Sequence, residues 1–373
     1  MAKTFRNFIG GEWVAPQTGA YFDNRNPADT SDHIGRFPDS GRKDVDAAVR
    51  SARRGFALWS RTPAPARGDV LRRVGDLLVE RKEALANAMT REMGKVLAET
   101  RGDVQEGIDT AYYAATEGRR LFGRVVPSEL RSKWAMSYRR PIGVAGLITP
   151  FNFPLAIPTW KMFPALLCGN SVVIKPSEDV PHTVHQLVEI LLEAGLPPEV
   201  VQLVHGRGET AGKALVEHPD VAVVSFTGST ATGSVIGETC GRMHKRLSLE
   251  MGGKNAIIVM DDADLDLALE GVLWARSARR ASGAPPPAGS FSTARFTTAS
   301  SGGWWTRRSA CASATGASPG PMWARSSTRR RARRWSPTSR SGRTRALSWL
   351  PAGRRRGAPC PTAGSTVRPC SRR

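Results

Sequence analysis

Apolar residues in the first part of the chain recur with two different periods. From residue 44 to residue 120 they return every three or four positions among charged residues, which gives a helix one apolar face. One such face contains Val70, Leu71, Val74, Leu77 and Leu78. Pro63 and Pro65 interrupt the pattern, so we expect two helices separated at that point. The first 35 residues or so instead predict short strands and turns.

From residue 144 onward, short apolar runs alternate with helical stretches. The runs VAGLI, VVIK, VVQLV and VAVVSF predict strands over 144–148, 172–175, 200–204 and 221–226. Helices are predicted to follow them over 159–167, 182–195, 209–218 and 231–243. Strands that are apolar throughout and separated by helices are typical of a parallel sheet covered on both faces. The sequence therefore predicts an α/β fold, a doubly wound parallel-sheet nucleotide-binding domain. A strand over 254–260 and a helix over 262–274 indicate the start of a second domain.

The composition of the chain changes abruptly after Trp274. The formal net charge of +21 belongs entirely to residues 275–373, which contain 21 Arg and no Asp or Glu. This tail also lacks Lys, Asn, Gln, His and Tyr, which with Asp and Glu are the amino acids whose codons have A at the middle position. No packing requirement selects that set, but translation of a GC-rich gene one base out of frame produces it. We interpret residues 275–373 as an out-of-frame, Arg-rich tail, which we expect to be disordered.

Charge and cysteine content exclude several classes of function. Because the first 274 residues are neutral overall, the basic tail is no evidence of a specific nucleic-acid partner. The five cysteines show no metal-binding spacing, and Cys168 and Cys240 are expected to be inert buried thiols. The N-terminus lacks the apolar core of a signal peptide, and no apolar run reaches the ~20 residues of a membrane span. We expect a cytoplasmic protein without a membrane partner.

Two motifs with candidate chemistry follow the first two predicted strands after residue 144. The turn PFNFP, residues 150–154, presents the amide of Asn152, which is either an oxyanion donor or only a local hydrogen-bonding group. The segment KPSE ends the next strand, where doubly wound sheets bind ligands. Lys175 and Glu178 could hold ribose hydroxyls, and the carboxylate would disfavour a 2′-phosphate, so NAD fits better than NADP. The alternative for this segment is a solvated turn.

Two more motifs lie farther along the chain. The segment 228–233, GSTATG, opens a predicted helix and is either a phosphate-binding position or only a helix cap. Glu250 stands beside two glycines in LEMGGK. It could act as a general base if it were partly buried with a raised pKa, or it could be a surface acid at a strand end.

In this order and spacing, the motifs resemble the aldehyde dehydrogenase superfamily over residues 5–274. The segments that carry the resemblance are IGGEWV, TPFNFP, ALLCGNSVVIKPSE, SFTGST and LEMGGKN. The resemblance implies that Asn152 donates to the oxyanion of a thiohemiacetal and that Glu250 is the general base. It implies cofactor contacts from Ile148, Thr149, Pro150, Phe151, Lys175, Ser177, Glu178, Gly228, Ser229 and Gly233.

The same resemblance implies the cofactor, the partners and the domains. The cofactor would be NAD, with NADP as an alternative, and the substrate a small-molecule aldehyde that is oxidised to a carboxylic acid. The NAD-binding domain would occupy residues 1–250, with part of an oligomerisation arm near 121–140. The catalytic domain would begin at 251–274, and the intact protein would be a homo-oligomer.

The nucleophile of the family, a cysteine in a G-Q-x-C segment beyond the GST turn, is absent here, because no cysteine lies between Cys240 and Cys311. A shift of one base allows residues 275–285 to be read as Gly-Ala-Phe-Gly-Thr-Thr-Gly-Gln-Arg-Cys-Thr. Residues 322–330 can be read in the same register as Asp-Val-Gly-Pro-Val-Val-Asn-Glu-Ala. Loss of one G at the Trp274 codon would explain both readings. We expect this chain to be catalytically inactive; an NAD-binding pseudoenzyme and nonspecific nucleic-acid binding through the tail are the alternatives.

Overall fold

The computed structural model describes residues 3–253, 257–260, 262–277 and 290–292, and its centre is a seven-stranded sheet of order β11-β10-β7-β8-β9-β1-β2. Strands β7 to β11 pair in parallel, and β1 and β2 add an antiparallel edge. The predicted parallel sheet is therefore confirmed. The strands of this sheet are β1 (Asn7–Ile9), β2 (Glu12–Val14), β7 (Val144–Ile148), β8 (Ser171–Lys175), β9 (Val201–Leu203), β10 (Val221–Gly228) and β11 (Arg246–Met251).

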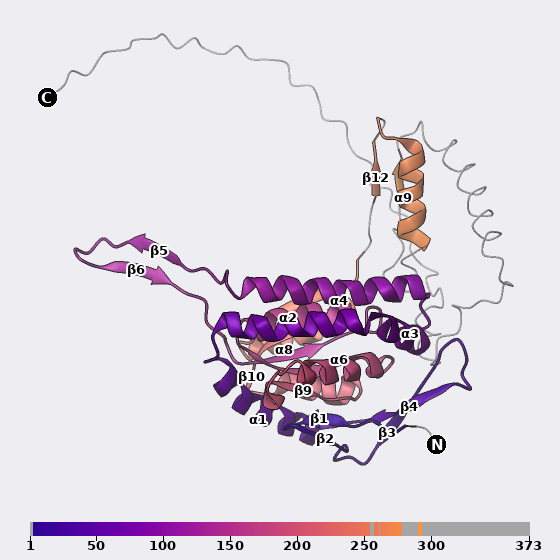
Figure 1. The fold of residues 1–373 in the computed structure, drawn as a ribbon, viewed down its shortest axis with the longest axis horizontal. Helices are drawn as coiled ribbons and strands as arrows, with labels where there is room; N and C mark the ends of the chain where they lie inside the picture. Colours follow the sequence, from indigo (N-terminus) through magenta and orange to yellow (C-terminus); the bar gives the residue numbers. More distant parts are fainter. Residues whose placement is uncertain (1–2, 254–256, 261, 278–289, 293–373) are drawn as a thin grey trace, which may run out of the picture.

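Helices cover both faces of this sheet, as the doubly wound fold requires (Figure 1). The helices are α1 (Arg42–Trp59), α2 (Ala64–Glu80), α3 (Lys82–Met93), α4 (Leu97–Glu117), α5 (Ala156–Leu167), α6 (Pro181–Glu193), α7 (Lys213–Glu217), α8 (Thr230–Arg242) and α9 (Leu265–Ser277), with a 3-10 turn (Pro198–Val200) and a π-helical turn (Gly208–Gly212). One apolar cluster joins the sheet to α2 through α6, and a second joins it to α1, α7 and α8. Val172 and Ile174 belong to the first cluster and Val173 to the second. Alternate residues of one strand thus serve opposite faces.

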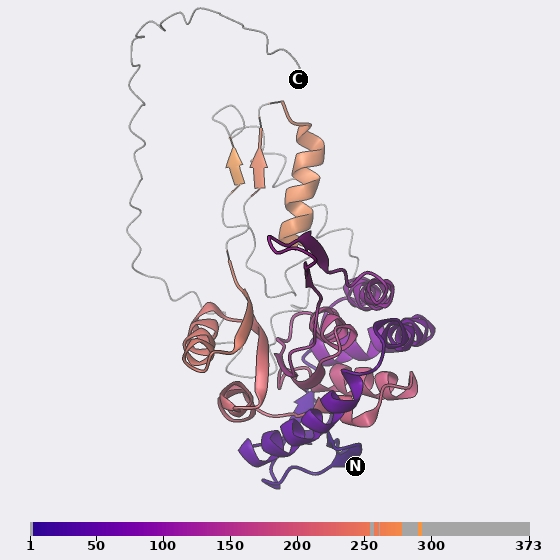
Figure 2. The ribbon, with the colours of Figure 1, turned by 90° about the vertical axis from the view of Figure 1, so that its left-hand side faces the viewer.

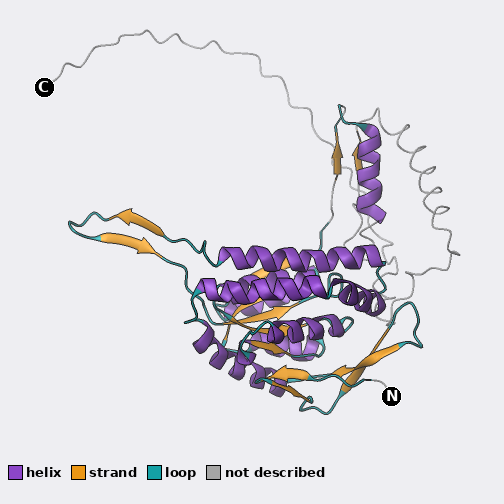
Figure 3. Cartoon of the chain, in the orientation of Figure 1, coloured by secondary structure: helices purple, strands orange, loops and turns teal. Residues whose placement is uncertain are grey.

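The helical region between residues 44 and 120 differs from the prediction, because it contains four helices rather than two (Figure 3). The break at Pro63 is confirmed. Two more breaks occur at Arg81 and at Gly94, whose φ of +80° is the left-handed conformation that ends α3. The apolar spacing continues on both sides of these short breaks, so periodicity alone did not reveal them.

Three small β pairs lie outside the main sheet. They are β3 (Tyr21–Arg25) with β4 (His33–Pro38), β5 (Arg124–Pro127) with β6 (Trp134–Ser137), and β12 (Ile257–Val259) with β13 (Ser290–Ser292). The β5–β6 hairpin projects from the body of the molecule (Figure 1), and β12 and α9 lie apart from the main sheet (Figure 2). Strand β12 and helix α9 fall on the strand and helix predicted after residue 253. Nearly all of the tail predicted to be disordered lies outside the described residues.

Candidate active site

All four motifs follow parallel strands, so the fold brings them to one edge of the sheet. In the strand register, Ile148 at the end of β7 lies opposite both Lys175 of β8 and Phe226 of β10. Near the end of β10, Thr227 lies opposite Glu250 of β11. Ligands of doubly wound sheets bind outside the carboxyl ends of the strands. This edge is therefore the candidate site.

Lys175 is held firmly at the end of β8. Only 3% of the residue is exposed, and its Nζ donates to the carbonyls of Pro176 (2.7 Å) and Gly206 (3.0 Å). The Glu178 carboxylate is 3.8 Å away. Burial lowers the pKa of Lys175, and the Glu178 carboxylate opposes that shift. An ammonium has three donors, and the two carbonyls accept from two of those of Lys175.

Two residues near Lys175, Ser177 and Thr149, form hydrogen bonds within the protein. The Ser177 Oγ accepts a hydrogen bond from the Asp179 amide at 3.3 Å, so it stabilises the local turn. The Thr149 amide donates to the Lys175 carbonyl at 3.3 Å and joins the end of β7 to the end of β8. Thr149 Oγ1 is buried and has no hydrogen-bond partner within the described part of the chain. Such an atom is available to a polar ligand group.

The GST turn caps helix α8. The Ser229 Oγ accepts from the Thr232 amide at 3.2 Å and shares a hydrogen bond of 2.8 Å with Thr232 Oγ1. The cap alternative is thus confirmed, and the phosphate position stays a prediction that depends on the other amides of this first turn. At Gly233 a Cβ would overlap Met251 Sδ on β11, so the exposed Met251 side chain would have to move. At Gly228 a Cβ would overlap the ring of Phe226.

Asn152 lies in the turn between β7 and α5. The residue is half-buried, and its Oδ1 is buried without a hydrogen-bond partner among the described residues. Pro150 and Phe151, in the same turn, are also half-buried. The neighbouring Phe153 ring packs on Trp160 at a centroid distance of 6.3 Å. The turn is therefore packed against protein on one side.

Glu250 is exposed in this structure, so the partial burial that one alternative requires is not seen, and its role as a general base stays a prediction. Its strand, β11, is the last strand of the sheet and pairs only with β10 in the described part of the chain. The surface acid at a strand end is the alternative that the structure supports. Sequence reasoning missed Lys161 of α5, whose Nζ donates to Ser225 Oγ at 2.9 Å. Burial lowers the pKa of Lys161 to about 8, and the Glu250 carboxylate opposes that shift.

The sequence contained a signal for Lys161, because it is the only charged residue in the largely apolar stretch TWKMFPALL, residues 159–167. A buried or half-buried ammonium must meet a carboxylate or a hydrogen-bond acceptor. The lysine therefore predicts such a partner, although its identity depends on the packing of α5 against β10.

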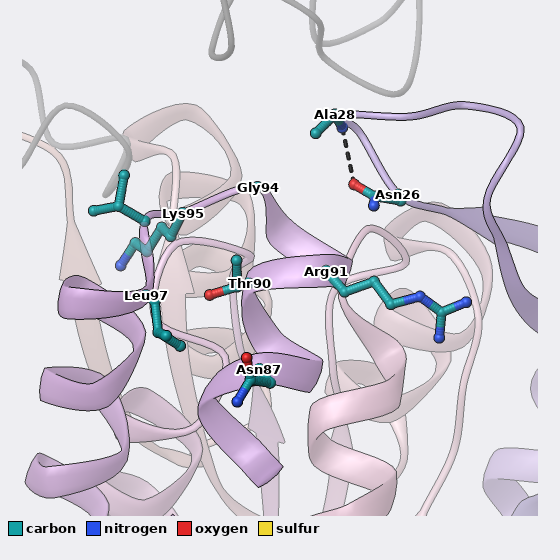
Figure 4. Close-up of a pocket in the computed structure, with 9 residues that line it drawn as sticks. Asn26, Ala28, Asn87, Thr90, Arg91, Gly94, Lys95 and Leu97 are labelled. Carbon is teal, nitrogen blue, oxygen red and sulfur yellow. Dashed lines mark hydrogen bonds between the residues drawn. The ribbon is translucent and has the colours of Figure 1, made fainter. Parts of the chain in front are cut away.

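A surface hollow of about 440 Å³ lies beside the turn between α3 and α4 (Figure 4). Its polar side chains already have partners: Arg91 pairs with Asp32, and Thr90 shares a 2.8 Å hydrogen bond with Thr100. The lining residues are Asn26, Ala28, Asn87, Thr90, Arg91, Gly94, Lys95, Val96 and Leu97. This hollow is not the candidate site, because none of the motifs lines it.

Neither cysteine of the described region resembles a nucleophile. Cys240 is buried, as expected, whereas Cys168 is only partly buried. Burial raises the pKa of both thiols, which keeps them protonated. The described residues contain no group of three or more His, Cys, Asp or Glu side chains placed to hold a metal ion. Among the helices that the structure describes, none has the length and apolar character needed to cross a membrane.

Comparison with known proteins identifies the family. The model of the "Aldehyde dehydrogenase family" matches residues 13–281. The alpha-ketoglutaric semialdehyde dehydrogenase of Bacillus subtilis (strain 168) is 43% identical over 271 residues, 73% of this chain and 56% of that protein. The solved structure of the NAD-dependent aldehyde dehydrogenase from Sinorhizobium meliloti has a TM-score of 0.79 and 32% identity, and the match covers 82% of this chain and 61% of that one.

A second solved structure, PnpE in complex with nicotinamide adenine dinucleotide, has a TM-score of 0.78 and 36% identity, with 81% of this chain and 62% of that one covered. The chain thus spans little more than half the length of the Bacillus relative, 56%. The matched region contains all four motifs at the sheet edge. This chain belongs to the aldehyde dehydrogenase family.

Proposed function

We propose that the intact protein oxidises an aldehyde to a carboxylic acid with NAD. We also propose that the 373-residue chain itself does not catalyse this reaction. One observation carries the proposal: the oxyanion-turn, ribose, phosphate and base motifs stand in family order at a single sheet edge. Solved relatives that are NAD-dependent or hold NAD support the cofactor assignment. The semialdehyde in the name of the Bacillus relative favours a small aldehyde as the substrate class.

The residues at this edge fit NAD. Lys175 and Glu178 would hold the adenosine ribose, and the amides at the start of α8 would face the pyrophosphate. The orphaned Thr149 Oγ1 is the atom on the β7 side that a bound polar group would satisfy. When bound, NAD supplies the acceptor for hydride. NADP is the less favoured cofactor, because the Glu178 carboxylate would repel a 2′-phosphate.

The chain's own groups supply the remaining chemistry. The Asn152 amide would donate to the oxyanion that forms when a thiolate attacks the aldehyde carbon. The Glu250 carboxylate would accept a proton from the water that hydrolyses the thioester. The missing part is the thiolate, since burial raises the pKa of both Cys168 and Cys240 and neither lies in a G-Q-x-C segment.

We further propose that residues 275–373 are an out-of-frame translation. The one-base re-reading supplies the G-Q-x-C segment, with the cysteine codon shared by Gly283 and Ala284. The family match, which ends at residue 281 near the change in composition after Trp274, supports this explanation. In the proposed domain plan, residues 1–250 bind NAD and residues 251–274 begin the catalytic domain.

The β5–β6 hairpin is proposed as part of an oligomerisation arm in the intact protein. Every residue of both strands is exposed, including Trp134 (77%) and Met136 (69%). Large apolar side chains in this exposed position are typical of a surface that another subunit covers. The proposed partner is a second copy of the protein.

The proposed function is tested by restoring the reading frame. NADH formation is measured for the 373-residue chain, for the frame-restored protein and for a frame-restored protein in which the G-Q-x-C cysteine is replaced by serine. We expect aldehyde-dependent NADH only from the second, with the other two roughly 10⁶-fold slower. NADH production by the 373-residue chain, or an inactive but NAD-binding restored protein, would contradict the proposal.

A further inference from the structure

Two charged side chains outside the four motifs contact the turn that contains Asn152 and the start of helix α5. Lys95 follows α3, and Asp103 lies in α4, about fifty residues before the turn in the sequence. Both are buried, with exposures of 2% for Lys95 and 1% for Asp103. Buried charges are costly unless they are paired, so these two residues need an explanation.

Lys95 contacts the turn through Phe153. Its Nζ lies 3.7 Å from the centroid of the Phe153 ring and 4.0 Å from the Glu99 carboxylate. Cation–π attraction is strongest when the ammonium is shielded from water, as it is here. Figure 4 shows Lys95 leaving the α3–α4 turn in the direction away from Arg91. Lys95 thus lines the hollow, and its ammonium packs on the ring of Phe153.

Asp103 contacts the other end of the same turn. Its Oδ1 accepts a hydrogen bond of 2.7 Å from the amide of Ala156, the first residue of α5. A carboxylate at this position satisfies one of the free amides of the helix and interacts favourably with the helix dipole. Burial raises the pKa of the Asp103 carboxyl to about 6, and the nearby Lys95 charge opposes that shift. Asp103 therefore fixes where α5 begins.

Both contacts fall just after Asn152, because Phe153 is the next residue and Ala156, four residues after Asn152, starts helix α5. We propose that Lys95 and Asp103 are positioning residues that hold the turn 150–156 so that the Asn152 amide faces the reacting atoms. This inference rests on the oxyanion role of Asn152 in the proposed function. Neither residue touches the substrate; both act through the backbone and ring of the turn.

Hydrogen exchange measured by mass spectrometry on the 373-residue chain tests the inference without needing activity. The variants are Lys95→Met and Asp103→Ala, with Lys95→Arg and Asp103→Asn as conservative versions that keep the cation and the acceptor oxygen. Lys82→Met is the matched control, because Lys82 also links α3 to α4, through a 2.6 Å hydrogen bond to Gln105, without touching the turn.

We expect the amides of residues 150–158 to exchange about tenfold faster in Lys95→Met and Asp103→Ala, since one lost contact to a charged group corresponds to about that factor. Exchange in β7 and β8 should be unchanged, the conservative variants should restore protection, and Lys82→Met should match the parent. Unchanged exchange in 150–158 would overturn the inference. So would faster exchange spread evenly over the sheet, because that would indicate only a general loss of stability.

An NAD titration of the frame-restored parent keeps the two proposals separate. The exchange result does not depend on the cofactor. Absence of NAD binding by the frame-restored parent would count against the proposed function, and the exchange pattern would still decide the role of Lys95 and Asp103.

Discussion

The two sides of the candidate site differ sharply in how the fold encloses them. Every residue of β7 and β8 is buried, whereas most residues of β11 are exposed. Lys175, on the cofactor side, is 3% exposed, and Glu250, on the reacting side, is exposed. On the cofactor side, β7 and β8 each pair with a strand on either side, and helices cover both faces of the sheet. The reacting side has a single neighbouring strand, β10, within the described residues.

This difference indicates that the cofactor side is built by residues 1–253, while the reacting side needs segments that come later in the chain. In the family, the nucleophile segment belongs to that later part. If the proposed change of reading frame after Trp274 is correct, it would explain both the exposed Glu250 and the absent cysteine. The comparison leads to three predictions, which begin with the largest effect.

The first prediction concerns the packing of the two sides. Leu147→Ala in β7 removes a 1% exposed side chain from the first apolar cluster and should lower the free energy of unfolding by about 2–5 kcal/mol. Leu249→Ala in β11, where the side chain is only partly buried, should lower it by less than about 1 kcal/mol. Denaturant unfolding of both variants measures the difference. Equal losses would contradict the contrast between the two sides.

The second prediction concerns Asp103, whose pKa burial raises from 3.8 to about 6. Because the folded state holds this proton more tightly than the unfolded state, the stabilisation is complete below about pH 4 and is lost as the pH rises through 6. Relative to Asp103→Asn, the parent should therefore lose about 3 kcal/mol of unfolding free energy over that range.

Unfolding of the parent and of Asp103→Asn at matched pH values measures this loss, and a difference that does not change with pH would count against it. The comparison must be made between the two proteins, because His182 acts in the opposite direction. Burial lowers the pKa of His182 to about 4, so its contribution to stability is lost as the pH falls.

The third prediction concerns the cofactor side. Lys175→Met should raise the Kd of the frame-restored protein for NAD by about tenfold, because it removes a charged donor to the ribose. Lys213→Met is the control, since the Lys213 side chain is 68% exposed on α7. Quenching of protein fluorescence by NAD measures both values. A Kd that is the same in both variants would show that Lys175 does not contact the cofactor.

The sequence predicted strands β7 to β10 of the sheet, because apolar runs such as VAGLI are buried on both faces and coincide with β7. It did not predict β11, whose residues are mostly exposed and form no apolar run. It also predicted the edge where the motifs meet, since parallel strands end on the same side. It did not predict the break at Gly94, which one residue creates without disturbing the apolar spacing. The roles of Lys95 and Asp103 depend on contacts with residues about fifty positions away, which no local pattern contains.

The most direct test of the central claim is the DNA sequence of the gene from the Trp274 codon onward. The account predicts that, read one base out of the present frame, this DNA encodes Gly-Ala-Phe-Gly-Thr-Thr-Gly-Gln-Arg-Cys-Thr and stays open through the codons of residues 275–373. A shifted frame that meets stop codons there, or that has no cysteine codon across Gly283 and Ala284, would contradict the account.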